Sequence, residues 1–427
     1  MTDRLERLAR RAHDAFAAWR TTSVRERAAH LIAVADDITR DSDALARLVT
    51  SEVSKTIRGA ATEIAKCADY CRWLEQHGER ILAPRHLGDN ATLIYEPLGV
   101  VAGIMPWNFP LWQVFRFAAP ALLAGNTVVV KHSPLVPRCA EALQQLFARC
   151  GDGVFTCVAA TAEEAQRLIA CEVVRAVSFT GGADAGAAVA ATAGAHLKKC
   201  ILELGGSDAF IVMPSANLDA AVQGAASSRM RAGGQACTAA KRFLIAEEIA
   251  DEFTARLIEA TQRIVIGDPF DPATELGPLV REEFADRLER QLRESVDTGA
   301  RILSGGRRLG ACLFEPTVVA VDSTDVPLMQ EETFGPVAPL LRVRGLDEAI
   351  AAANRTRYGL SASIWTEDAR EIDAFTRALH VGQLYVNATV SSRFDVPFGG
   401  TKDSGFGREL GDAGIYELVN GKSIVRN

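Results

Sequence analysis

From residue 100 onward, short apolar runs alternate with stretches of helical periodicity, and this alternation most constrains the fold. Strand candidates lie at residues 100–104, 127–130, 153–158, 173–179 and 200–204. Helix candidates lie between them at residues 120–123, 140–150, 162–170 and 183–195. This pattern predicts a doubly wound α/β sheet, because parallel strands need a crossover helix between them.

The remaining chain divides around this unit. Apolar residues recur every three or four positions through residues 5–79, which predicts helices. Residues 91–95 are expected to form an edge strand. After Gly205 and Gly206 the alternation begins again. Strand candidates follow at 209–212, 242–246, 318–321 and 337–343, and helix candidates at 249–265 and 282–298. A second α/β domain is therefore expected, in keeping with the length of 427 residues.

Composition excludes several classes of function. With 48% apolar and 24% charged residues, the chain is neither disordered nor collagen-like. The net charge of −7 argues against non-specific nucleic-acid binding, although a local basic patch stays open. No apolar stretch reaches the length of a membrane span, and the N-terminus has no signal-peptide core. We therefore expect no nucleic-acid or membrane partner.

Cysteine and histidine usage points to a reducing compartment. The nine cysteines show no C-x-x-C spacing, and the seven histidines form no H-E-x-x-H motif. Neither a disulfide framework nor a metal site is expected from this pattern. A cytoplasmic location fits best.

Two residues are candidates for covalent or acid–base chemistry. Cys237 lies among small residues in G-G-Q-A-C-T-A-A-K-R and is either a nucleophile or an ordinary buried thiol. Glu203 lies near the end of an apolar run, just before two glycines. A carboxylate there is costly unless it is used or paired, so a helix cap or a structural ion pair is the alternative.

Two loops are candidates for binding. Asn108, in the proline-rigid loop P-W-N-F-P, could donate its amide to an oxyanion or form an Asx turn. Residues 179–186 read F-T-G-G-A-D-A-G between a strand and an alanine-rich helix. Such a turn is a candidate phosphate site, although it lacks the G-x-G-x-x-G pattern and also fits a plain turn.

Together and in order, these motifs resemble the aldehyde dehydrogenase superfamily over nearly the whole chain. The matching segments are E-P-L-G-V-V-A-G-I-M-P-W-N-F-P (96–110), A-G-N-T-V-V-V-K (124–131), F-T-G (179–181), L-E-L-G-G (202–206), G-Q-A-C (234–237), E-E-T-F-G-P (331–336) and P-F-G-G-T-K-D-S-G-F-G-R-E (397–409). Within the superfamily, residues 112–120 and 197–208 are most similar to the short bacterial succinate-semialdehyde dehydrogenases.

The resemblance implies an architecture. A Rossmann-type dinucleotide-binding domain would comprise residues 1–78 and 98–204, and a second α/β catalytic domain residues 205–398. Residues 79–97 and 399–427 would form a small β oligomerisation element and tail. A homodimer or homotetramer is implied by analogy.

The resemblance also implies a mechanism. Cys237 would attack the aldehyde carbon, and the Asn108 amide and the Cys237 backbone N–H would hold the resulting oxyanion. Hydride transfer to NAD or NADP would leave a thioester, which water activated by Glu203 would hydrolyse. The product is a carboxylic acid.

The implied cofactor contacts run along the chain. Lys131 would bind the adenosine ribose, Glu332 the nicotinamide ribose, and Phe334 would pack beside the nicotinamide. Gly182 replaces a serine common in the family, and Pro134 stands where NAD-preferring members often carry glutamate, so the choice between NAD and NADP stays open. The whole set is Pro106, Trp107, Lys131, Ser133, Pro134, Phe179, Thr180, Gly181, Gly182, Gly186, Leu204, Glu332 and Phe334.

The substrate class follows from arginines. The resemblance places Arg116 and Arg231, with Trp112, at the substrate mouth, where two guanidinium groups would clamp a distal carboxylate and would also suit a phosphonate. Surface or ion-paired arginines are the alternative, and Arg229 is another candidate clamp. A short anionic aldehyde is therefore expected.

Other features leave room for a different enzyme. Ala232 replaces an asparagine usual before the G-Q-x-C segment, and in S-S-R-F-D-V-P Arg393 and Asp395 exchange the places of acid and arginine found in close relatives. The substrate could therefore be another aldehyde. A CoA-acylating enzyme generally lacks the carboxylate at Glu203, and a non-catalytic homologue would not need Cys237 and Glu203 together.

Overall fold

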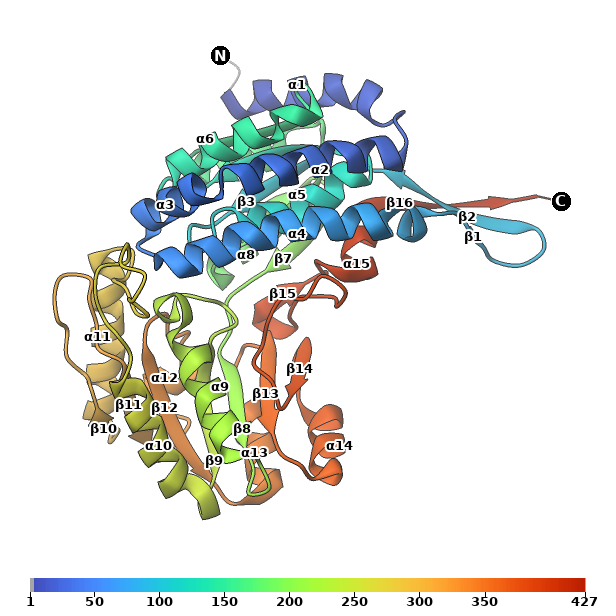
Figure 1. The fold of residues 1–427 in the computed structure, drawn as a ribbon. Coiled ribbons are helices and arrows are strands. Elements are labelled where there is room, and N and C mark those ends of the chain that lie inside the picture. Colours follow the sequence, from blue (N-terminus) through green and yellow to red (C-terminus); the bar gives the residue numbers. More distant parts are fainter. Residues whose placement is uncertain (1–3, 427) are drawn as a thin grey trace.

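The computed structural model describes residues 4–426 and contains three sheets (Figure 1). The first has six strands in the order β15-β7-β6-β3-β4-β5, parallel except for β15. Its strands are β3 (Val100–Met105), β4 (Thr127–His132), β5 (Phe155–Ala159), β6 (Val174–Thr180), β7 (Lys199–Glu203) and β15 (Gly405–Phe406).

Helices cover both faces of this sheet, which explains its unbroken apolar strands. Successive β3 residues point to opposite faces, so that Val101 packs in one core cluster and Val100 and Ala102 in another. The helices on the two faces are α1 (Arg4–Trp19), α2 (Val24–Arg40), α3 (Ser42–Val53), α4 (Ile57–Leu82), α5 (Trp112–Leu123), α6 (Pro137–Leu146), α7 (Ala162–Ala170) and α8 (Ala183–Ala195).

The second sheet has seven strands in the order β10-β11-β12-β9-β8-β13-β14. The strands are β8 (Asp208–Val212), β9 (Ala240–Ala246), β10 (Arg301–Ser304), β11 (Thr317–Val321), β12 (Val337–Val343), β13 (Ser361–Trp365) and β14 (Gln383–Val386). The helices around it are α9 (Leu218–Met230), α10 (Ala250–Gln262), α11 (Glu282–Asp297), α12 (Pro327–Gln330), α13 (Gly345–Asn354) and α14 (Ala369–Ala378).

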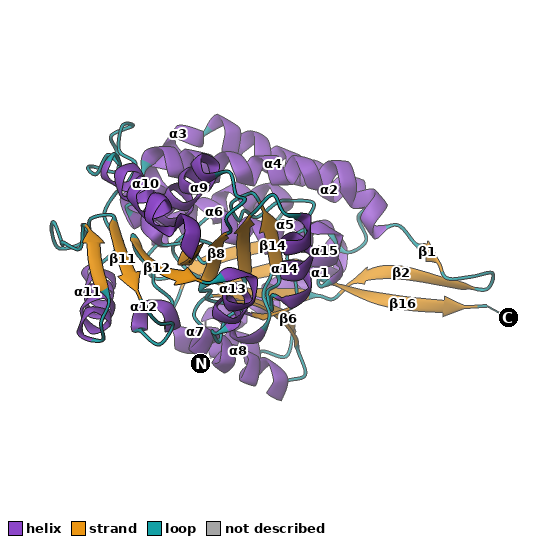
Figure 2. Cartoon of the chain, turned by 90° about the horizontal axis from the view of Figure 1, so that it is seen from below, coloured by secondary structure: helices purple, strands orange, loops and turns teal. Residues whose placement is uncertain are grey.

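A narrow third sheet projects from the molecule in both views (Figures 1 and 2). It consists of β1 (Arg85–His86), β2 (Ala91–Pro97) and β16 (Val419–Val425), paired antiparallel. Within the expected tail 399–427, only β16 joins this sheet. The short strand β15 pairs with β7 in the six-stranded sheet. The helix α15 (Gly411–Tyr416) lies between β15 and β16 in the sequence.

The expected fold class is confirmed, with changes at element boundaries. The helix expected at 120–123 is the last turn of α5, which starts at Trp112 and holds Pro120 in its interior. Proline is favoured in the first turn of a helix, whereas Pro120 lies inside α5. The short helices η1 (Phe147–Cys150), η2 (Arg231–Gly234), η3 (Glu247–Ile249) and η4 (Lys402–Ser404) complete the chain.

Gly103 in β3 provides a test of the close packing of α5 on the sheet. A Cβ added there would lie 2.1 Å from Cζ of Phe117, whose ring is buried. We expect Gly103→Ala to lower the free energy of unfolding by about 1–3 kcal/mol, because the ring cannot move without disturbing its neighbours. The midpoint of urea unfolding measures this.

Gly194 in α8 is the matched control. A Cβ there would meet no atom within 4 Å. Gly194→Ala should leave stability unchanged or raise it by up to about 1 kcal/mol, since alanine favours helix. Equal effects of the two substitutions would contradict the packing described here.

Candidate active site

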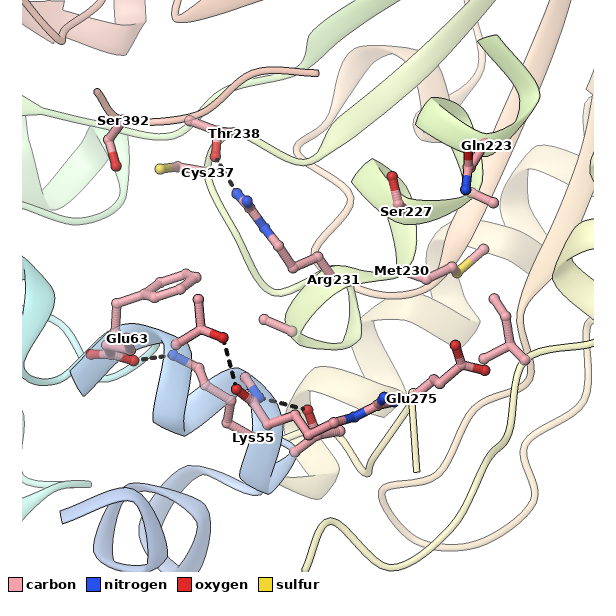
Figure 3. A pocket seen from close by; sticks show the side chains of 18 of the residues that line it. Lys55, Glu63, Gln223, Ser227, Met230, Arg231, Cys237, Thr238, Glu275 and Ser392 are labelled. Carbon is pink, nitrogen blue, oxygen red and sulfur yellow. Dashed lines mark hydrogen bonds and ion pairs between the residues drawn. The ribbon is translucent and has the colours of Figure 1, made fainter. Parts of the chain in front are cut away.

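Cys237 lies where two cavities meet. One cavity has a volume of about 1070 Å³, and the other, of about 550 Å³, lies against the loops that follow the first sheet's strands. Cys237 and Gln113 line both. Figure 3 shows the Cys237 thiol at one end of the larger cavity. A molecule in either cavity can therefore reach the same thiol.

The turn that carries Cys237 leads from η2 into β9 and is fixed by Lys241. The Lys241 ammonium donates to the backbone carbonyls of Ala236 and Cys237, at 3.0 and 2.6 Å. Burial raises the pKa of the Cys237 thiol to about 11, and the nearby Arg116 and Lys241 charges oppose this increase only in part. The resting thiol is therefore protonated at neutral pH.

Asn108 lies in the smaller cavity on the loop between β3 and α5. Its Nδ2 donates to the carbonyl of Gln235 at 2.9 Å, and its Oδ1 accepts from Gln113 Nε2 at 3.0 Å. These bonds fix the amide near the turn that holds Cys237. An amide nitrogen carries two hydrogens, so one donor remains for a ligand.

Glu203 lies outside the lining of both cavities. It ends β7, is 2% exposed, and neither carboxylate oxygen has a hydrogen-bond partner among residues 4–426. The absence of a side chain at Gly399 makes room for it, because a Cβ there would lie 2.6 Å from Glu203 Oε1. Burial and the nearby Glu409 carboxylate raise the pKa of Glu203 well above its usual range.

Arg116 is not free to clamp a ligand. It is 3% exposed, forms a buried ion pair with Glu409, and donates to Thr180 Oγ1 at 3.2 Å. Its guanidinium also lies over the Phe398 ring, 4.7 Å from the centroid. The ion-paired alternative therefore describes Arg116, although it lines the larger cavity.

Arg229 and Arg231 differ sharply. Arg229 is fully buried and donates to backbone carbonyls, including those of Ala240 and Gly234 at 2.9 Å, so the hypothesis of an Arg229 clamp is wrong. Arg231 is exposed to the larger cavity and contacts Thr238 Oγ1 at 3.4 Å (Figure 3). Arg231 therefore remains a candidate for binding an anion.

The smaller cavity gathers most of the expected cofactor residues and fits a dinucleotide. Gly182 caps α8 without a side-chain hydrogen bond, which leaves N–H groups for a diphosphate. Glu332 presents a carboxylate suited to ribose hydroxyls, held by Gly206 N–H at 3.1 Å. The expected residues that line the cavity are Pro106, Trp107, Thr180, Gly181, Gly182, Leu204, Glu332 and Phe334.

The other expected cofactor residues do not line this cavity. Lys131 lies at the carboxyl end of β4, where it is paired in register with Ile104, and Phe179 pairs with Ile104 from the other side. Ser133 and Pro134 follow β4, so they share the edge of the sheet from which the cavity opens. Gly186 packs against Leu204, since a Cβ there would lie 2.4 Å from a Leu204 methyl.

Sequence reasoning missed several residues of the larger cavity. Lys66 lies on α4, where the sequence predicts a helix and no binding role, and donates to Ser392 Oγ at 2.6 Å. Lys55 and Glu63 form a buried ion pair, and Glu63 also accepts from the backbone N–H groups at the start of α5. Glu409 is the last residue of the family-like segment 397–409, and this segment is the sequence signal that could have identified it.

The described residues contain neither a membrane-spanning helix nor a metal-binding cluster of side chains. Across residues 4–426 no helix is long and apolar enough to cross a membrane. The same residues hold no cluster of three or more His, Cys, Asp or Glu side chains that could bind a metal ion.

Fold and site together define an α/β protein with two large sheets and a cavity of about 550 Å³ that reaches the Cys237 thiol. The sequence model of the aldehyde dehydrogenase family matches residues 2–424 of this chain. The chain belongs to the aldehyde dehydrogenase family, and the expected fold and enzyme class are confirmed.

Within the family, the chain is similar to several succinate-semialdehyde dehydrogenases. The chain is 42% identical to a succinate-semialdehyde dehydrogenase [NADP(+)] of Deinococcus radiodurans, with 98% of this chain and 89% of the relative covered. A Mycobacterium tuberculosis succinate-semialdehyde dehydrogenase [NADP(+)] 1 is 41% identical, with 99% and 94% covered. The crystal structure of the Streptococcus pyogenes succinic semialdehyde dehydrogenase with NADP⁺ superposes on this chain with a TM-score of 0.96 at 33% identity. The match covers 100% of this chain and 96% of that chain.

The high pKa of Cys237 predicts how the thiol reacts without ligands. Because only the thiolate is alkylated, the rate with iodoacetamide should rise about tenfold per pH unit from pH 7 to pH 10. Peptide mass spectrometry of Cys237 after timed quenching gives the rate. A plateau below pH 9 would contradict the enclosed, protonated thiol.

Proposed function

We propose that the protein oxidises a short anionic aldehyde, with succinate semialdehyde as the first candidate, to the carboxylic acid. The position of Cys237 between the two cavities is the observation that carries this proposal. The larger cavity would hold the aldehyde, and the smaller would hold NADP or NAD. The NADP(+) in the names of the relatives agrees with that expectation.

Cys237 begins the reaction. The thiol first loses its proton to solvent water. The thiolate sulfur then attacks the aldehyde carbon, forming a C–S bond, and the carbonyl oxygen becomes an oxyanion. Asn108 Nδ2, which keeps one hydrogen free, and the Cys237 backbone N–H donate to that oxygen. Lys241 fixes the turn and so aligns this N–H. Such preorganised donors stabilise charge as it develops.

NADP or NAD, when bound, supplies a hydride acceptor that converts the adduct to a thioester on Cys237. The groups that would hold it are the N–H groups of the turn at Gly181 and Gly182, Glu332 at a ribose, and Phe334 beside the nicotinamide. Lys131 and Ser133 would contact the adenosine end from the edge of β4.

Glu203 would complete the cycle by accepting a proton from water. The hydroxide formed attacks the acyl carbon, the C–S bond breaks, and the thiolate leaves and takes up a proton. For this step the Glu203 side chain turns from Gly399 toward Cys237. Arg116 favours ionised Glu203, because its positive charge lowers the pKa of that carboxyl against the effect of burial.

The division into domains remains part of this proposal. Residues 1–78 and 98–204 would bind the cofactor, residues 205–398 would carry the thiol, and residues 79–97 and 399–427 would pair copies of the chain in a homodimer or homotetramer. A cytoplasmic location also stays a prediction.

Glu203→Gln tests the hydrolytic step. We expect one NADPH per site to form in a rapid burst, followed by steady-state turnover reduced about 10²–10⁴-fold, because the thioester then accumulates. Stopped-flow absorbance with succinate semialdehyde and NADP⁺ measures both phases. Unchanged turnover would contradict the role of Glu203, and acyl-CoA formation by wild type in added CoA would favour the CoA-acylating alternative.

Pro134→Glu tests the cofactor preference. A carboxylate there would repel the 2′-phosphate, so kcat/KM for NADP should fall at least about tenfold while that for NAD changes little. Pro134→Ala removes the ring without adding charge and should leave the ratio unchanged. Equal losses in the two variants would place the adenosine end elsewhere.

A further inference from the structure

The larger cavity is rich in cations, most of which already have counter-charges. Lys55 pairs with Glu63, Arg116 with Glu409, Arg256 with Asp219 and Glu252, and Arg263 with Glu259. The cationic residues that line this cavity are Lys55, Arg58, Lys66, Arg116, Arg231, Arg256 and Arg263.

Lys66 and Arg231 lack such a partner. Within residues 4–426, no carboxylate lies at ion-pair distance from either, and each instead contacts a neutral hydroxyl. Lys66 Nζ donates to Ser392 Oγ at 2.6 Å, and Arg231 Nη2 donates to Thr238 Oγ1 at 3.4 Å. Positive charges that face one cavity without a counter-charge attract anions into it, so Lys66 and Arg231 together favour an anionic ligand.

Both hydroxyls lie at the end of the cavity where the thiol is. Thr238 follows Cys237 in the chain, and Figure 3 draws the Ser392 hydroxyl at the same end, with the Arg231 guanidinium pointing toward Thr238. An anion between Lys66 and Arg231 would therefore be close to Cys237.

The wall beside Lys66 is apolar. Its ammonium lies 4.5 Å from the centroid of the Trp112 ring, and Trp112 and Phe398 both line the cavity. A ligand there would meet an apolar wall along a short methylene chain and positive charge at its end. This arrangement matches an aliphatic aldehyde with a terminal carboxylate.

We propose that Lys66 on α4 and Arg231 together bind the distal carboxylate of the aldehyde, while Arg116 serves to balance buried acids. This inference rests on the proposed aldehyde oxidation, and it adds Lys66 as a specificity-determining residue. Arg58, which also lacks a carboxylate partner, donates to the Thr274 carbonyl at 3.5 Å and is not part of this subsite.

Kinetics separate this role from a structural one. Lys66→Met should raise KM for succinate semialdehyde about 10–100-fold, the usual worth of a charged hydrogen bond, and raise KM for butanal far less. Lys66→Arg keeps the charge and should recover most of the loss. Arg58→Met is the matched control, and it should change the ratio of the two kcat/KM values less than about threefold.

Two outcomes would overturn the subsite. If Arg58→Met and Lys66→Met change the ratio equally, the cavity attracts anions only through its general charge. If Lys66→Met raises both KM values equally, Lys66 has a structural role alone.

The pH dependence gives a second readout. Burial, together with the Arg231 and Arg116 charges, lowers the pKa of Lys66 to about 8, while Cys67 and Glu63 oppose this. A lysine with a lowered pKa loses its charge as pH rises through that value. KM for succinate semialdehyde should therefore rise above pH 8 in wild type and stay flat in Lys66→Met and in butanal assays.

Alkylation tests the subsite without any aldehyde turnover. In γ-iodobutyrate the reacting carbon and the carboxylate have the spacing found in succinate semialdehyde, and γ-iodobutyramide is its neutral match. Wild type should label at Cys237 at least about tenfold faster with the anion, and Lys66→Met should lose that preference. Absence of the preference in wild type, or its survival in Lys66→Met, overturns the subsite. A preference without any aldehyde oxidation would contradict only the proposed function.

Discussion

The buried pair of Arg116 and Glu409 is the interaction on which the site depends. It joins α5, which follows the Asn108 loop, to the segment after β15, which pairs with β7 of the six-stranded sheet. Glu203 and Cys237 both lie within the field of its guanidinium. Removing one partner of a buried pair costs about 3–5 kcal/mol, because the other charge is left alone. The pair therefore holds α5 against the C-terminal segment and balances the charge around two buried carboxyl groups, Glu203 and Glu409.

The arrangement of the strands explains why the two cavities meet at one thiol. The loops after the parallel strands of the six-stranded sheet line the smaller cavity, and the turn before β9 brings Cys237 to them from the seven-stranded sheet. Lys241 fixes this turn through its carbonyl groups. With Arg116 committed to Glu409, the free positive charge of the larger cavity rests with other residues, among them Arg231 and Lys66.

The alternation of strands and helices could be predicted because it depends on local sequence. Cys237 and Asn108 were indicated by the ordered series of family-like motifs, since each residue alone also fitted a structural role. Contacts between segments that lie far apart in the sequence could not be predicted. Nothing in the sequence near Arg116 indicates that it pairs with Glu409. Lys66 lies on a helix with no unusual sequence feature, and only the fold brings Ser392 into contact with it. Arg229 and Arg231 stand two residues apart, yet one is buried in backbone carbonyls and the other faces the cavity, because α9 ends between them.

The proposed function depends on covalent attachment of the aldehyde to Cys237 during oxidation. Acid quenching of the protein during turnover with NADP⁺ and succinate semialdehyde, followed by peptide mass spectrometry, tests it most directly. The proposed mechanism requires a succinyl thioester on the peptide that contains Cys237. The corresponding peptide of Cys237→Ala should carry no succinyl group. Formation of NADPH and acid with Cys237 unmodified, or an acyl group on another residue, would contradict the account.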